Sequence, residues 1–134
     1  WPTTAFASST APFRICVLGE DPFKDKLDLA VENERVGERS VEVKRFTELE
    51  QTANCQIVFV SKSEQRFKAH IFEFLKPYSI LTVSDMEQFL EAGGMVQFYH
   101  KENKVRFFIR PQALAEATLK VSSRLLKVGE VVEN

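Results

Sequence analysis

The sequence predicts a single α/β domain of three layers, with a mostly parallel sheet, an antiparallel C-terminal hairpin and a terminal helix. Two patterns predict this class. Short apolar runs alternate four times with segments of helical period, and two further short strands then flank the polar loop His100–Lys104. With 134 residues, 44% of them hydrophobic, the chain is long enough to bury one core. We therefore expect one domain over residues 1–134, with residues 1–12 as an extended N-terminal segment.

The first strand–helix unit is predicted from Phe13–Leu18, an apolar strand, and from Asp21, which is a suitable N-cap before Pro22. The second strand, Ser40–Phe46, alternates apolar and charged residues, which is typical of an edge or half-exposed strand. A short helix is expected at Leu49–Ala53. The helix that begins after Asp21 should bury Phe23, Leu27 and Val31 on one face.

The run Cys55–Val60 is continuously apolar, as in a strand covered on both faces. Ser61 and Glu64 form a capping-box pattern for a helix that continues to Lys76 and is stopped by Pro77. The buried face of this helix is predicted to hold Phe67, Ile71, Phe74 and Leu75.

The C-terminal half begins with a fourth strand, Ser79–Val83. A second capping box, Ser84 with Glu87, predicts a helix to about Ala92. Met95–Tyr99 and Val105–Ile109 are predicted to be strands that form a hairpin. A last helical stretch is predicted to begin at Pro111 and to end at about Val132.

The turn after the first strand resembles a nucleotide-binding turn in position but not in chemistry. It reads Gly19-Glu20-Asp21-Pro22, with one glycine, two carboxylates that repel phosphate and a proline that lacks an N–H donor. Gly19 is therefore interpreted as the tight turn of an ordinary α/β unit.

Composition excludes several function classes. A formal net charge of −1, with 18 basic residues interleaved among 19 acidic ones, argues against nucleic-acid binding. No run is long and apolar enough for direct membrane insertion. No nucleophile motif or metal-ligand spacing is present, so we expect no enzyme activity, no metal and no cofactor.

The two cysteines leave two possibilities open. Cys16 lies within the first strand and Cys55 opens the third, and in a flavodoxin-like strand order these strands are neighbours. The thiols would then be within disulfide reach, or they would remain as two buried free thiols.

Two surfaces are candidates for binding. Arg106, Phe108 and Arg110 share one face of the last strand, which suits a carboxylate or a flat ring, although an edge strand guarded by charges is the alternative. The terminal stretch carries more apolar residues than one narrow stripe, so part of it is expected to face another chain. Its candidate residues are Leu119, Leu125, Leu126 and Val128.

Four stretches, FRICVLGEDPF, CQIVFVS, ILTVSDMEQFLEAGGMVQFYHKENKVRFFI and LKVSSRLLKV, closely resemble the YfiR family of periplasmic repressors. The resemblance runs from about Trp1 to Val132. It implies a non-enzymatic regulator that binds the periplasmic region of an inner-membrane diguanylate cyclase, represses it and so lowers cyclic-di-GMP signalling and biofilm formation. It further implies a homodimer, sequestration by an outer-membrane lipoprotein, and a Cys16–Cys55 disulfide in the oxidising periplasm.

Two departures from the family pattern modify these expectations. Family members usually begin with another helix before the Trp-Pro pair, and we expect that helix to be missing here, either lost or removed; a signal peptide is also expected to have been removed. Where family members read VRFEIN this chain reads VRFFIR, which argues against a small-ligand pocket built on that carboxylate. Ser122 and Ser123 still match. The alternative function is a periplasmic small-molecule sensor, with a pocket near Arg106, Phe108, Ser122 and Ser123.

Overall fold

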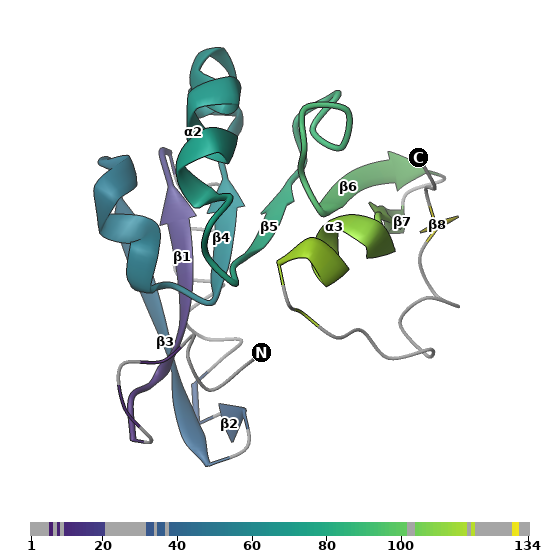
Figure 1. The fold of residues 1–134 in the computed structure, drawn as a ribbon. Coiled ribbons are helices and arrows are strands. Elements are labelled where there is room, and N and C mark those ends of the chain that lie inside the picture. The colour runs from purple at the N-terminus through teal and green to yellow at the C-terminus, as the bar shows by residue number, and fades with distance from the viewer. Residues whose placement is uncertain are drawn as a thin grey trace.

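The computed structural model describes residues 6, 8, 10–20, 32, 33, 35, 36, 38–101, 104–117, 119, 130 and 131. Its described strands form one sheet in the order β2-β3-β1-β4-β5-β6-β7-β8 (Figure 1). The strands are β1 (Phe13–Leu18), β2 (Arg35–Val36), β3 (Arg39–Phe46), β4 (Ile57–Val60), β5 (Leu81–Ser84), β6 (Val96–Lys101), β7 (Lys104–Ile109) and β8 (Glu130–Val131). The helical segments are the 3-10 helices η2 (Leu49–Asn54) and η3 (Lys62–Phe67) and the helices α2 (Lys68–Leu75) and α3 (Pro111–Glu116).

The strand pairing confirms the predicted fold class. β3, β1, β4, β5 and β6 are mutually parallel neighbours, and β6 and β7 form the predicted antiparallel hairpin. β1 lies between β3 and β4, as in the flavodoxin-like order. The predicted helix around Leu27 lies outside the described residues.

Residues along the central strands alternate between two core clusters. Cys16, Leu18, Val58 and Val60 belong to one, which also holds Ile71 and Leu75 of α2. Since adjacent strand residues point to opposite faces, the second cluster lies across the sheet. It contains Val17, Phe59, Val83, Val96, Ile109, Leu114 of α3 and Leu119. The core therefore covers both faces of β1 and β4, as their apolar sequences predict.

The predicted helix over Ser84–Ala92 is wrong, because this segment forms a series of turns. Gln88 has a φ of 62°, which interrupts a right-handed helix. The Leu90 N–H donates to Gln97 Oε1 at 3.1 Å instead of to a helical carbonyl. Ser84 does act locally as predicted, since its hydroxyl accepts from the Met86 N–H at 3.0 Å.

The helix predicted from Ser61 to Lys76 is divided between η3 and α2. Ser61 caps it, with its Oγ accepting from the Ser63 N–H at 3.4 Å. The Ser61 N–H donates to the Leu18 carbonyl at 3.0 Å, so the reciprocal bond expected from Glu64 is not made. Phe67, predicted to be buried, is 50% exposed, because it lies at the change from 3-10 to α geometry.

The last helix begins at Pro111, as predicted, but α3 ends at Glu116. Glu130 and Val131 are a strand that pairs in parallel with Phe108 and Ile109 of β7, so the predicted continuation of the helix to Val132 is wrong at these two residues. A paired strand at this position requires the chain to return to the edge of the hairpin.

Candidate functional site

The outer face of the β6–β7 hairpin carries the predicted arginine–aromatic row. Tyr99 is opposite Arg106, and Gln97 is opposite Phe108, so these side chains share one face. The Tyr99 and Phe108 rings stack with centroids 4.5 Å apart and planes 20° apart. Arg106 is exposed and both rings are partly exposed. We call Tyr99, Arg106 and Phe108 the hairpin surface.

The other face of the hairpin belongs to the core. Phe98 and Phe107 meet edge-to-face at 6.2 Å, and both pack against the second core cluster. Leu119, which was expected at a partner interface, is 6% exposed and lies in that cluster. Leu119 therefore supports the hairpin from behind and is not presented to a partner in this structure.

Arg110, the third member of the predicted row, is occupied within the fold. Its Nη1 donates to the Leu90 carbonyl, and its backbone N–H donates to the Met95 carbonyl at 3.0 Å. Its Nε is buried and lacks a hydrogen-bond partner among the described residues. Arg110 thus anchors the turn segment before β6, which is a structural role.

Ser122, Ser123, Leu125, Leu126 and Val128 lie outside the described residues. Their proposed part in binding remains a prediction from the sequence.

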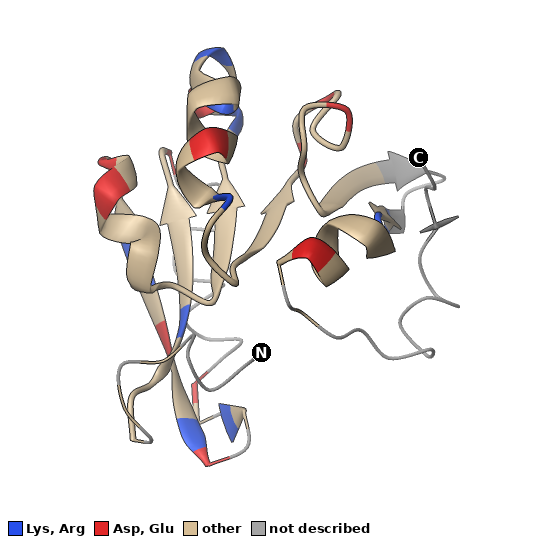
Figure 2. Cartoon of the chain, in the orientation of Figure 1, with Lys and Arg blue, Asp and Glu red and all other residues tan. Residues whose placement is uncertain are grey.

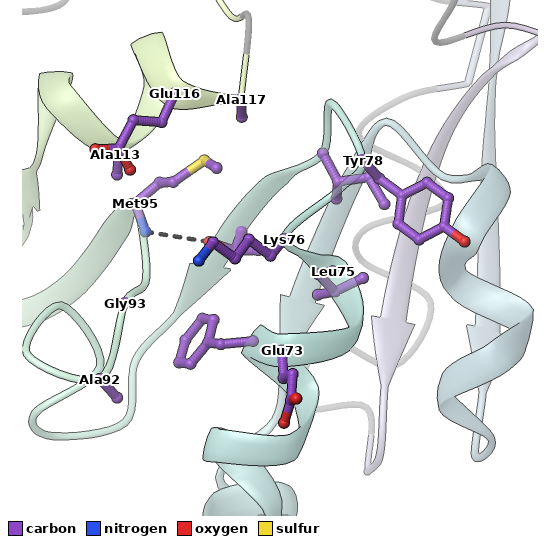
Figure 3. A pocket seen from close by; sticks show the side chains of 13 residues that line it. Glu73, Leu75, Lys76, Tyr78, Ala92, Gly93, Met95, Ala113, Glu116 and Ala117 are labelled. Carbon is purple, nitrogen blue, oxygen red and sulfur yellow. Dashed lines mark hydrogen bonds between the residues drawn. The ribbon is translucent and has the colours of Figure 1, made fainter.

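A cavity of about 600 Å³ lies between α2, α3 and the loop that precedes β6 (Figure 3). Its apolar lining includes Leu75, Ile80 and Met95, and the Met95 N–H is bonded to the buried Thr82 hydroxyl at 3.1 Å. The cavity also has charged side chains at Glu73, Lys76 and Glu116. Sequence reasoning missed this site, because its walls come from segments far apart in the chain.

Several residues that line the cavity are small, and such residues leave space in a folded protein. Gly93 has a φ of 121°, a conformation that disfavours other residues, so it shapes the loop. Ala113 of α3 and Ala117, which follows the helix directly, both line the cavity. Larger side chains at these positions would fill the space.

Cys16 and Cys55 are joined by a disulfide, with a Cα–Cα distance of 6.2 Å. This resolves the alternative of two free thiols. The two residues are 0% and 3% exposed, within the first core cluster. Because a reductant must reach a sulfur atom, the bridge is protected while the domain stays folded.

Side chains of η3 pack closely against Gly19 at the carboxyl end of β1. Gly19 has a φ of 95°, as its interpretation as a tight turn requires, and its N–H donates to the Phe46 carbonyl. A Cβ at this position would lie 2.6 Å from Ser63 Oγ and 2.8 Å from Glu64 Cγ. The side chains of η3 therefore fill the space beside Gly19, and Ser63 Oγ also accepts from the Glu20 N–H at 3.0 Å.

Charged side chains of both signs are distributed over the described part of the chain. Acidic and basic residues are interspersed over α2, whereas α3 carries the acidic Glu116 (Figure 2). In the part of the chain that the structure describes, no group of three or more His, Cys, Asp or Glu residues could hold a metal ion. None of the described helices is long and apolar enough to cross a membrane.

The described residues therefore form an α/β domain with an aromatic hairpin surface, a cavity and a buried disulfide. The model of the YfiR/HmsC-like family matches residues 1–130, so the chain belongs to this family. The family consists of periplasmic regulators of cyclic-di-GMP signalling and is regulatory rather than catalytic. No curated protein matches the sequence.

Proposed function

We propose that this protein binds the periplasmic region of an inner-membrane diguanylate cyclase and represses it, which lowers cyclic-di-GMP signalling. The family match over residues 1–130 carries the proposal. Repression requires only that the protein bind the inactive state of the cyclase more tightly than the active state. An outer-membrane lipoprotein that sequesters the repressor would release the cyclase.

The hairpin surface supports a binding role. It combines a stacked aromatic pair with an exposed arginine, and Tyr and Arg are enriched among residues that dominate binding energies. The core behind it holds the hairpin in place, so little ordering is needed on binding. We therefore assign the cyclase contact to Tyr99, Arg106 and Phe108, together with the terminal segment that includes Leu125.

The contact is tested by pull-down and titration with the cyclase's periplasmic region. Arg106→Asp and Leu125→Asp should each weaken binding at least ~30-fold, the effect of losing about 2 kcal/mol at a hot spot. Lys68→Asp, on helix α2, is the control and should bind normally. Unchanged affinity in Arg106→Asp, with the fold intact by circular dichroism, would remove the hairpin from the interface.

The cavity between α2 and α3 favours a second function, that of a small-molecule sensor. Its apolar lining suits the body of an amino acid or aromatic ligand, while Lys76 and Glu116 offer groups of opposite charge. This location differs from the pocket expected near Ser122 and Ser123.

A matched pair of variants tests the sensor. Ala113→Leu fills the cavity, whereas Ala115→Leu adds the same side chain on the exposed face of α3. A panel of amino acids should raise the melting temperature of the unaltered protein and of Ala115→Leu but not of Ala113→Leu. A panel that leaves the unaltered protein unshifted at millimolar concentrations would contradict the sensor function.

A further inference from the structure

We propose that the exposed end of the η3–α2 segment docks reversibly on a bilayer surface that contains anionic phospholipid. Lys62, Arg66, Phe67 and Lys68 form this end, and we call them the basic tip. The inference goes beyond the proposed contact with the cyclase and does not depend on it. The family acts in the periplasm, where a membrane surface is within reach of the protein.

An exposed aromatic ring lies at the centre of the basic tip. Phe67 is 50% exposed, more than any other large hydrophobic side chain in the part of the chain that the structure describes. It lies where η3 changes to α2, and no residue of η3 is buried. One exposed ring requires no explanation by itself, so the charges around Phe67 carry the argument.

Three cations surround this ring. The Arg66 guanidinium lies over it, 5.5 Å from the ring centroid. Lys62 and Lys68 are two turns of a 3-10 helix apart, so they share an adjacent side of the segment. The Lys62 side chain is 65% exposed. Basic residues mark the upper end of this ribbon, where it projects beyond the sheet (Figure 2).

The nearby carboxylates belong to the base of the segment, next to the sheet. Glu64 packs beside Gly19 at the carboxyl end of β1, and the Glu20 N–H donates to the first turn of η3 at 3.0 Å. Asp85 pairs with Lys62 at 3.9 Å, and an exposed pair at this distance is weak. The projecting end is therefore basic, although the whole chain has a net charge of −1.

This composition favours a bilayer over a protein as the partner. Lysine is depleted in protein–protein interfaces, and one ring supplies much less apolar area than a stable interface of roughly 800 Å² per partner contains. On a bilayer, the basic side chains reach the phosphate groups while the ring enters the boundary of the acyl chains. Each cation near an anionic surface strengthens binding roughly fivefold, so the docking is weak and reversible.

Co-sedimentation of the purified protein with vesicles tests the charge requirement. Vesicles of equal parts phosphatidylglycerol and phosphatidylcholine should bind the protein, and phosphatidylcholine alone should not. Arg66→Glu should weaken binding roughly tenfold or more, because a repelled carboxylate replaces a cation. Lys76→Glu is the matched control and should bind nearly as well as the unaltered protein. It makes the same charge change about 15 Å further along the segment, beyond the Debye length of about 10 Å at about 0.1 M salt.

A second pair of variants tests the ring. Phe67→Ser should weaken vesicle binding several-fold without changing the charge, because less apolar surface leaves water. Tyr78→Ser removes the exposed ring beyond the other end of α2 and should have little effect. Circular dichroism verifies that all variants are folded.

Three results would overturn the proposal. The first is binding that does not require the anionic lipid. The second is an equal loss in Arg66→Glu and Lys76→Glu, which would attribute binding to overall charge. The third is displacement by polyglutamate with unchanged binding of Phe67→Ser, which would assign the basic tip to an acidic protein. The cyclase pull-down contains no lipid, so Lys68→Asp remains its control and either proposal can fail alone.

Discussion

The parallel strands β1 and β4 and the hairpin β6–β7 are built from similar apolar sequences but meet different surroundings. β1 and β4 have core clusters on both faces and a disulfide beside them. The hairpin has a core on one face only, and its other face exposes Arg106 beside the Tyr99–Phe108 stack. Stability should therefore depend mainly on the parallel strands, and partner recognition on the outer face of the hairpin.

The largest expected effect on stability is at the disulfide. Replacing both Cys16 and Cys55 with Ala removes a link across 39 residues and should lower the free energy of unfolding by about 4 kcal/mol. Urea denaturation measures the loss. Thiol labelling of the unaltered protein should detect reduction by dithiothreitol only slowly unless denaturant is present, because both sulfur atoms are buried. Rapid reduction of the folded domain would contradict this burial.

Gly94→Ala tests the packing of the turn segment that connects the two regions. An added Cβ would lie 2.3 Å from the ring of Phe89, which is fully buried and cannot easily move. Overpacking of this kind should cost about 1–3 kcal/mol, measured by denaturation. Gly94→Ala with unaltered stability would mean that Phe89 is loosely packed.

Ser84→Ala should cost a similar or smaller amount, about 1–2 kcal/mol. The buried hydroxyl donates to the Val60 carbonyl at 2.6 Å and accepts from the Met86 N–H at 3.0 Å, so both backbone groups lose a partner. Ser40→Ala, at an exposed position, is the control and should change the melting temperature by less than the buried variant. Equal shifts in the two variants would contradict the structural role of Ser84.

Arg106→Ala should have the smallest effect on stability, within about 0.5 kcal/mol, because the side chain is exposed. Cyclase binding should nevertheless weaken markedly. Parallel denaturation and titration experiments measure both quantities on one variant. If Arg106→Ala lost stability but still bound the cyclase, Arg106 would contribute to folding and not to partner recognition, contrary to this account.

The strands could be predicted from the sequence because their signals are local. RICVL and IVFV are continuous apolar runs, and VEVK alternates, so their burial follows directly from residue type. The turns over Ser84–Ala92 could not be predicted, because Ser84, Glu87 and the spacing of Met86, Phe89 and Leu90 satisfy the local rules for a helix. In the structure, the Leu90 N–H instead donates to Gln97 of β6, and the Leu90 carbonyl accepts from Arg110, which directly follows β7.

The candidate site was predicted in part for the same reason. The period of two placed Arg106 and Phe108 on one face without tertiary information. It could not show that Arg110 is used by the fold, since its bond to the Leu90 carbonyl spans 20 residues. The disulfide was likewise undecided from the residues alone, because it depends on β1 and β4 being neighbours.

The most direct test of the central proposal is cyclic-di-GMP synthesis by a membrane diguanylate cyclase from the same organism, with the purified protein added at increasing concentration. Arg106→Asp is the matched control. We predict dose-dependent inhibition by the unaltered protein and little inhibition by the variant. Undiminished synthesis at saturating concentrations of the folded protein would contradict the repressor function.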